Sequence, residues 1–333
     1  GHFEGVAAIV LKLFNLTLAY DLKVMEDNQS LATVTSKVLL GIDEIIKKVA
    51  PDIVLVQGDT TSAFAAGLVA FYHKIAVGHV EAGLRTFKKY YPHPEEVNRS
   101  LLSCFTDLHF APTKTAAENL SRQGVPADRI FITGNTVIDA LFHTIDPNYK
   151  WKTGAGAVPK RLVLVTAHRR ENFGKPLENI CAAIKALVRN NPDIEVIYPV
   201  HLNPNVRKIV YKSLGNVRAV QLIPPLDYVT FVNLMARSYL ILTDSGGIQE
   251  EAPSLGIPVL VLREETERPE AVAAGVARLV GTNRLRIVRS AQELLDDQAA
   301  YSRMSRGVNP YGDGKASRRI VKTILSSFST GAR

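Results

Sequence analysis

Short apolar runs rich in valine and isoleucine alternate with amphipathic segments along almost the whole chain. The segment 30–50 spaces its apolar residues three or four positions apart, which predicts a helix, and Pro51 and Asp52 then lead into an apolar run. Apolar strands separated by helices are typical of parallel sheets covered on both faces. We therefore predict strands at 53–56, 75–78, 108–111, 130–133, 162–166, 195–200, 219–223, 240–243, 258–262 and 277–280.

The alternation breaks once, between residues 146 and 159. Asp146-Pro147-Asn148 opens this stretch, and Gly154, Gly156 and Pro159 interrupt the periodicity. A chain of 333 residues is long enough for about two domains. We predict an α/β fold of two Rossmann-like, doubly wound domains, at 1–147 and 158–310, followed by 311–333 with a helix at 315–327. The first half has four predicted strands against six in the second, so its initial strands are expected to be missing.

Composition excludes several classes of protein. Lys and Arg number 40 against 32 Asp and Glu, a net charge of +8, which favours anionic ligands. No block of like charge indicates a nucleic-acid partner. Cys104 and Cys181 lie far apart without a metal or redox spacing, which fits a reducing cytoplasm. No apolar run approaches the roughly 18 residues of a membrane span. Neither a zinc-type histidine spacing nor a dinucleotide-binding glycine motif after a strand occurs, so no metal and no nicotinamide cofactor is expected.

Polar residues follow the predicted strands at their carboxyl ends, where ligands bind in open α/β sheets. In the first half these residues are Asp59, Thr60 and, after the second strand, His79, Glu81 and Arg85. In the second half they are His168, Arg169, Arg170, Glu171, Asn172, His201, Asp244, Ser245, Gly246, Gly247, Arg263, Glu264 and Glu265. If the two edges face each other, they form one polar cleft between the domains.

The strongest local signal is the segment 243–253. A strand ends, two glycines let a ligand approach the backbone, and a helix begins, which together suit a diphosphate. Glu251 follows Gly247 by four residues on the same helix face and could accept hydrogen bonds from ribose hydroxyls. The alternative is a helix capped by Asp244 or Ser245 with tight packing at the glycines.

Other polar residues allow two interpretations each. Asp59 is a candidate site carboxylate or the cap of the next helix. Glu95 is a candidate acid or a helix-start carboxylate behind Pro94. His168 belongs to a site or to a solvated loop, and His201 suits a structural hydrogen bond. Arg85 and Arg99 are candidates to pair with these carboxylates or with a phosphate.

Six motifs occur together in one order. They are the segments 52–61, 78–86, 94–99, 132–140, 165–174 and 243–256, the last extended by Glu267-Arg268-Pro269-Glu270-Ala271. In combination they resemble the non-hydrolysing UDP-N-acetylglucosamine 2-epimerase family. The resemblance covers the chain from about residue 30 onward. It implies the glycosyltransferase-B architecture of two Rossmann-like domains, with a C-terminal helix crossing back to the first. It also implies a homodimer.

The same resemblance implies an activity and its residues. The family interconverts UDP-N-acetylglucosamine and UDP-N-acetylmannosamine without a metal or NAD, by loss of the C2 proton coupled to departure of UDP. Its catalytic carboxylates match Asp59, Glu81 and Glu95, and its essential histidine matches His168. The residues that match its UDP contacts are Phe231 at uracil, Ser245, Gly246 and Gly247 at the diphosphate, Glu251 at the ribose and Arg99 in the same anionic cleft.

The chain also departs from the family pattern. Members open with a strand and a Gly-Thr-Arg-Pro-Glu loop that reaches the phosphates, and we expect this chain to lack both. Bacterial members are activated by a second UDP-N-acetylglucosamine. Of the positions involved, Glu95, Arg169 and His201 are present, whereas the usual arginine aligns with Asn28.

Three other functions stay open at this point. A hydrolysing epimerase would release UDP and free sugar. A glycosyltransferase would share the fold and the UDP contacts. Glycosyl transfer needs no base at C2, so the clustered Glu81 and Glu95 argue against this function. A non-catalytic UDP-sugar-binding protein would keep the contacts without the chemistry.

Overall fold

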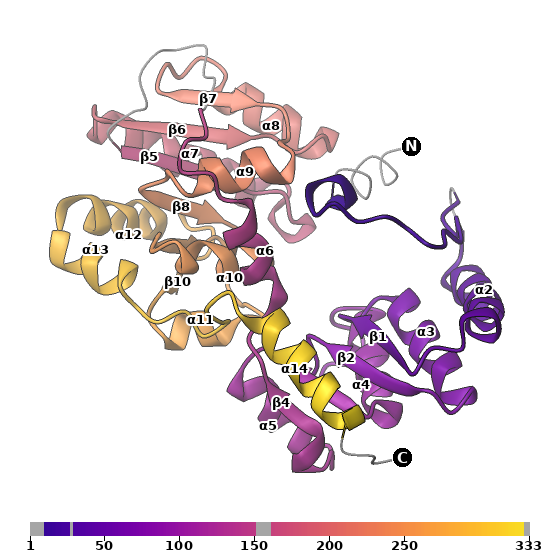
Figure 1. Cartoon of the computed structure of the whole chain (residues 1–333). Coiled ribbons are helices and arrows are strands. Elements are labelled where there is room, and N and C mark those ends of the chain that lie inside the picture. The colour runs from indigo at the N-terminus through magenta and orange to yellow at the C-terminus, as the bar shows by residue number, and fades with distance from the viewer. Residues whose placement is uncertain (1–9, 27–28, 151–160, 330–333) are drawn as a thin grey trace. The chain divides into compact units, whose positions relative to one another are not determined.

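A computed structural model describes residues 10–26, 29–150 and 161–329 (Figure 1). The chain divides into two compact units. One comprises Asn15–Asp139 and Tyr311–Arg333, and we call it the four-stranded unit; the other comprises Gly1–Phe14 and Ala140–Pro310, and we call it the six-stranded unit. The chain passes from the first to the second within helix α6 (Thr136–Thr144).

The four-stranded unit contains a parallel sheet in the order β1-β2-β3-β4. Its strands are β1 (Ile53–Gln57), β2 (Ala76–Val80), β3 (Leu108–Ala111) and β4 (Ile130–Ile132). Its helices are α2 (Leu31–Val49), α3 (Thr61–Tyr72), α4 (Glu95–Phe105) and α5 (Lys114–Arg122), with a short 3-10 turn η1 (Ala127–Arg129). Because successive strand residues point to opposite faces, Val56 and Val77 can pack on α2, α3 and α4 through Ile46, Val69 and Leu102.

The C-terminal helix α14 (Ala316–Ser329) is part of the four-stranded unit. The Asp139 carboxylate accepts hydrogen bonds from the backbone N–H groups of Ala316 and Ser317, at 3.0 and 2.9 Å. These are two of the donors that a helix start leaves without a partner. Arg319 also donates to the Thr133 carbonyl at the end of β4, at 3.0 Å. Residues far apart in the sequence therefore fix the start of α14.

The six-stranded unit contains a parallel sheet in the order β10-β9-β8-β5-β6-β7. Its strands are β5 (Arg161–Thr166), β6 (Ile194–Pro199), β7 (Val220–Ile223), β8 (Leu240–Thr243), β9 (Val259–Val261) and β10 (Ala277–Leu279). The order reverses between β5 and β8, so the chain builds outward in two directions from this pair. In such sheets the ligand site lies at the carboxyl ends of the two strands at the reversal.

Helices cover both faces of this second sheet, which makes it doubly wound. The helices are α7 (Lys175–Asn190), α8 (Pro204–Leu214), α9 (Tyr228–Met235), α10 (Gly246–Ser254), α11 (Pro269–Ala273), α12 (Arg284–Asp296) and α13 (Gln298–Ser305), with the 3-10 turn η2 (Arg170–Asn172). Val163 and Val165 pack in one cluster with α7, α8 and α12. Leu162 and Leu164 point the other way and are also fully buried.

All ten predicted strands are confirmed, and so are the predicted helices at 30–50 and 315–327. One strand, β2, differs in its extent from the prediction. This strand continues through His79 and Val80, so His79 is a buried strand residue and not part of a polar edge. The expectations for Asn28, Gly154, Gly156 and Pro159 lie outside the described residues. Within the described ranges, no helix combines the length and apolar character of a membrane span.

Candidate functional site

Asp244 organises the loop at the point where the order of the six-stranded sheet reverses. It follows β8 and is fully buried. Its Oδ2 accepts hydrogen bonds from the backbone N–H groups of His168 and Arg169, both at 2.8 Å, and from the Asn172 amide at 2.9 Å. The end of β8 therefore holds the loop that follows β5. Asp244 is thereby engaged across the sheet, which argues against the alternative that it caps α10.

Helix α10 presents an uncapped N-terminus beside this loop. Ser245 stands at the N-cap position, but its side chain makes no capping hydrogen bond, and the first turn contains no acidic residue. Gly246 is buried and Gly247 is exposed. A helix start with free N–H groups and a positive dipole end is suited to an anion. The predicted diphosphate residues therefore lie where an anion can approach the backbone.

Glu267 lies against this helix start. A Cβ atom on Gly246 would stand 2.8 Å from Glu267 Oε1, so Glu267 would have to shift to admit a larger residue. Glu267 also pairs with Arg169 at 3.1 Å and with the buried Arg263 at 2.5 Å. Burial opposes ionisation, but the nearby Arg263 holds the pKa of Glu267 below its usual range. Arg169, a candidate activator contact, is thus tied to the start of α10.

Glu251 lies one turn further along α10 and is 7% exposed. The Tyr228 hydroxyl, from the first position of α9, donates to its Oε1 at 2.7 Å. Burial raises the pKa of Glu251 to about 7. Phe231 stands three residues after Tyr228 on α9 and is half-buried. Tyr228 therefore joins α9, which carries the predicted uracil residue Phe231, to α10, which carries the predicted ribose residue Glu251.

His168 and His201 stack on each other at the ends of β5 and β6. Their ring centroids are 5.2 Å apart with an interplanar angle of 10°. Burial lowers the pKa of His168; His201 and Arg169 act in the same direction and Asp244 opposes them. His201 Nδ1 accepts a hydrogen bond from the Asn203 N–H at 3.1 Å, as a structural histidine would. The two histidines thus form one pair, with His168 favoured in its neutral form.

In the four-stranded unit, Arg99 joins two carboxylates. Its guanidinium lies 2.9 Å from Asp59 Oδ2 and 3.6 Å from Glu96 Oε2, and the residue is 7% exposed. Glu96 also accepts the backbone N–H groups of Thr86 and Phe87, at 3.0 and 2.9 Å. The ion pair with Asp59 agrees with the expectation that Arg99 pairs with one of the candidate carboxylates. Glu96 is the buried structural neighbour of Glu95.

Asp59 is not the cap of α3. That position belongs to Thr60, whose side chain accepts the N–H of Ala63 at 3.2 Å. The Asp59 carboxylate is therefore available to Arg99, and its carbonyl accepts a 3.0 Å hydrogen bond from the Asn98 amide. Both contacts come from α4, so one helix orients Asp59.

Glu81 follows β2 in a conformation that non-glycine residues rarely adopt, with φ of +66°. The Asn135 amide donates to its Oε1 at 3.3 Å, and its Oε2 lies 3.4 Å from the position of a Cβ on Gly58. Glu81 is half-buried. Strained backbone of this kind clusters at functional sites, because surrounding contacts must maintain it. Glu81 and Asp59 thus come from the loops after neighbouring strands.

Glu95 is the first residue of α4 and is half-buried. Pro94 is the N-cap rather than the first helical residue. Across the described parts of the chain, no hydrogen bond or ion pair to the Glu95 carboxylate is found. Arg85, in contrast, pairs with no carboxylate among the described residues; it donates to neutral oxygens of Gln123, Ser103 and Leu84. The idea that Arg85 pairs with the site carboxylates is therefore wrong.

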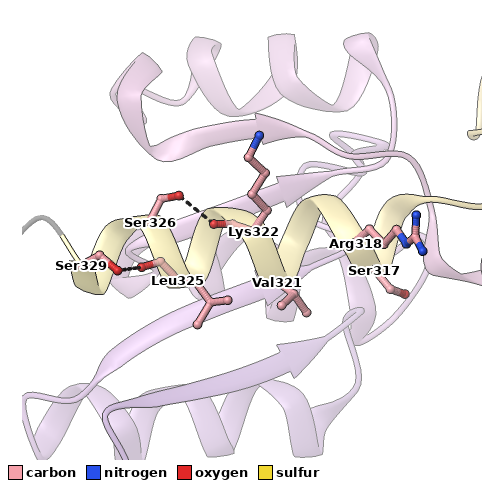
Figure 2. Close-up of a pocket in the computed structure, with 7 residues that line it drawn as sticks. All are labelled: Ser317, Arg318, Val321, Lys322, Leu325, Ser326 and Ser329. Atoms are coloured by element: carbon pink, nitrogen blue, oxygen red, sulfur yellow. Dashed lines mark hydrogen bonds between the residues drawn. The ribbon is translucent and has the colours of Figure 1, made fainter.

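A hollow of about 710 Å³ runs along α14 and contains none of the predicted site residues (Figure 2). Val321, Lys322 and Leu325 contribute to its lining. It is open and mostly apolar. It lacks converging polar groups like those that follow β1 and β2 in one unit and β5 and β8 in the other. Among residues 10–26, 29–150 and 161–329, no cluster of three metal-ligating side chains occurs.

Sequence reasoning missed several residues that hold the site. The sequence places Asp244 at a strand end and as a possible cap but does not show that it holds the loop after β5, and it assigns no role to Tyr228, Asn98, Asn135 or Glu267. Asn98, Asn135 and Tyr228 give no local signal in the sequence, because their hydrogen-bond partners lie 23 to 54 residues away. Glu267 stands in a motif that pointed to the family, which was the only indication available for it.

Comparison with known proteins gives the family. The family model described as UDP-N-acetylglucosamine 2-epimerase matches residues 2–325. The UDP-N-acetylglucosamine 2-epimerase of Bacillus subtilis strain 168 is 52% identical over 319 residues, covering 96% of this chain and 84% of that protein.

Solved structures agree. A co-structure of S. aureus MnaA with UDP is 49% identical with a TM-score of 0.89, covering 96% of this chain and 86% of that one. The Neisseria meningitidis UDP-GlcNAc 2-epimerase bound to UDP-GlcNAc is 45% identical with a TM-score of 0.85, covering 97% and 89%. These similarities extend over both parallel sheets and all six motifs, and the chain belongs to the UDP-N-acetylglucosamine 2-epimerase family.

Proposed function

We propose that this chain interconverts UDP-N-acetylglucosamine and UDP-N-acetylmannosamine without net hydrolysis. The observation that carries the proposal is the Asp244 carboxylate, which holds the His168 loop beside the uncapped start of α10. That arrangement suits a diphosphate. The relatives with bound UDP and UDP-GlcNAc support the same ligand class for this chain.

The six-stranded unit supplies the groups that bind UDP in this proposal. The Ser245 hydroxyl and the N–H groups of Gly246 and Gly247 receive the diphosphate, and Glu251 accepts hydrogen bonds from the ribose. Phe231, on the helix of Tyr228, packs against uracil. His168 interacts with the phosphates as a neutral imidazole, because its burial lowers its pKa.

The chemistry at C2 requires a leaving group at C1. A C2 proton is only weakly acidic, so its removal is coupled to cleavage of the C1–O bond, and UDP departs with the bonding electrons. The intermediate is 2-acetamidoglucal. Return of a proton to the opposite face of C2 and of UDP to C1 completes the inversion. Preorganised anion contacts stabilise the charge that develops on UDP.

The four-stranded unit supplies the acid and base groups. We assign Glu81 and Glu95 to proton transfer at C2, because two faces of one carbon require two positioned groups. Asp59 is assigned to orientation, since Arg99 already engages its carboxylate at 2.9 Å. Arg169 and His201 are proposed as contacts of an activating second substrate molecule, and both adjoin the His168 loop.

Incubation with UDP-N-acetylglucosamine in D2O, followed by NMR, tests the proposal. Deuterium at C2 of both UDP-sugars is expected, without accumulation of free sugar. Free UDP with free N-acetylmannosamine would indicate the hydrolysing reaction, and transfer to an added acceptor would indicate a glycosyltransferase. Saturable binding with unchanged substrate would indicate a binding protein. If Glu81→Gln kept full deuterium incorporation, the assignment of Glu81 would be wrong.

A cytoplasmic homodimer that supplies cell-surface polysaccharide synthesis completes the proposal. The family resemblance supports the dimer and the role in polysaccharide synthesis. The two free cysteines, Cys104 exposed and Cys181 buried, fit a reducing cytoplasm. Sedimentation of the purified chain tests the dimer; a single monomeric species at micromolar concentration would contradict it.

A further inference from the structure

We propose that His79 is a positioning residue that holds the Gly58–Asp59 turn in register with Glu81. This inference rests on the proposed function, because it concerns the same carboxylates. His79 lies within β2 and is fully buried, so it does not contact solvent. Its role is therefore exerted through other residues.

The backbone of Gly58 is bound to β2 at both of its polar groups. His79 Nε2 lies 2.7 Å from the Gly58 carbonyl oxygen, and the Gly58 N–H donates to the Val80 carbonyl at 3.0 Å. Gly58 has φ of +70°, a conformation in which glycine is free of strain. Such a residue has wide conformational freedom, so these two bonds are needed to keep it in one place.

The contact with a carbonyl oxygen defines the tautomer of His79. A carbonyl only accepts, so Nε2 must carry the hydrogen and Nδ1 is left as a bare acceptor. Nδ1 is buried, and no hydrogen-bond partner for it occurs in the described parts of the chain. Burial lowers the pKa of His79 to about 4. At neutral pH the imidazole is therefore an uncharged donor with a fixed direction.

Gly58 stands between the two carboxylates whose geometry matters. Asp59 follows it directly, and α4 fixes Asp59 through Asn98 and Arg99. On its other side, a Cβ on Gly58 would stand 3.4 Å from Glu81 Oε2. Any shift of Gly58 consequently changes the distance between Asp59 and Glu81. His79 is the side chain that opposes this shift from β2.

His109 provides a matched control. It pairs with His79 in the register of β2 and β3, and it is 1% exposed. Its Nδ1 is also buried without a partner in the described ranges, and burial lowers its pKa to about 3. Its backbone contact is with Thr106, whereas the Gly58 carbonyl is bound by His79. The two histidines share burial and charge state but not the contact with the catalytic turn.

Three variants of the full chain test the inference: His79→Leu, His109→Leu and His79→Gln. We expect kcat for C2 deuterium incorporation to fall about a hundredfold in His79→Leu, as misplaced catalytic groups do. The UDP dissociation constant should stay within about twofold, because removing an interaction used only in the reaction leaves ground-state binding intact. His79→Gln, whose amide N–H can donate to the same carbonyl, should recover part of kcat. His109→Leu should retain kcat.

Amide hydrogen exchange supplies a readout that does not depend on activity. The Gly58 N–H should exchange faster in His79→Leu than in His109→Leu or His79→Gln. Equal kcat losses and equal Gly58 exchange in the two leucine variants would overturn the inference. So would a His79→Gln variant no better than His79→Leu. A failure of the proposed function is distinguishable, because the wild-type chain itself would then incorporate no deuterium or would release free sugar.

Discussion

The Tyr228 hydroxyl donates a hydrogen bond of 2.7 Å to Oε1 of Glu251, and so joins α9 to α10. Burial raises the pKa of Glu251 to about 7; the bond from Tyr228 lowers it, and the adjacent Glu250 raises it further. Glu251 consequently changes charge near neutral pH. A carboxylate accepts from two ribose hydroxyls, whereas its protonated form has lost part of that capacity.

We expect the affinity for UDP to decrease as the pH falls below about 7, because Glu251 becomes protonated there. Tyr228→Phe removes the hydrogen bond that lowers the pKa, so the midpoint should move to higher pH. Calorimetric titration at several pH values measures both. Glu251→Gln is the control, since its remaining pH dependence reports the titration of UDP itself. An unchanged midpoint in Tyr228→Phe would contradict the prediction.

Arg99→Met should both destabilise the chain and abolish C2 exchange. The substitution leaves the buried Glu96 and the partly buried Asp59 without their cation, and breaking a buried ion pair costs about 3 to 5 kcal/mol. Urea unfolding measures the loss. Arg278→Met is the control, because its pair with Glu293 is exposed and such pairs contribute under about 1 kcal/mol. Similar losses in both variants would refute this reading.

Gly246→Ala should lower both the melting temperature of the ligand-free chain and its affinity for UDP. The new methyl group would stand 2.8 Å from Glu267 Oε1, so Glu267 or the start of α10 must move. Gly247→Ala is a matched control one residue away, where the nearest atom is Glu251 Oε2 at 3.9 Å. Its ligand-free stability should be unchanged or higher, because alanine favours a helix. The comparison requires only thermal melts and UDP titrations.

Asp244→Ala should weaken UDP binding by at least about tenfold and lower stability by several kcal/mol. The substitution removes the acceptor of three N–H groups, and each buried donor left unpaired costs about 1 to 3 kcal/mol. Asp193→Ala is the comparison, because it loses a partly exposed ion pair with Arg161. Calorimetry and urea unfolding provide the two measurements. Retention of UDP affinity in Asp244→Ala would rule out its role in shaping the site.

Periodicity alone was sufficient to predict the strands and the α/β class. The reason is that a strand buried on both faces must be apolar throughout, as Val163, Leu164 and Val165 are. The start of α10 was predicted from the two glycines that closely follow an apolar strand. These features depend on residues within a few positions of each other, which a sequence displays directly.

Adjacent polar residues were much harder to separate. Asp59 and Thr60 are both good helix caps, and only the structure assigns the cap to Thr60 and the ion pair to Asp59. Glu95 and Glu96 are consecutive on α4, and only packing against residues 86–87 decides that Glu96 is the structural one. The residues of each pair have similar preferences for helix caps and helix starts, so these preferences do not distinguish their roles.

His79 and Asp244 mark the limit most clearly. A histidine after an apolar run reads as the end of a strand, yet pairing of β2 with β3 buries it against Gly58. Asp244 reads as a cap, yet it binds a loop 75 residues earlier in the chain. Local periodicity and capping preferences are encoded over one or two helical turns. Which distant polar groups meet depends instead on strand order and register, and these emerge only when the whole sheet is assembled.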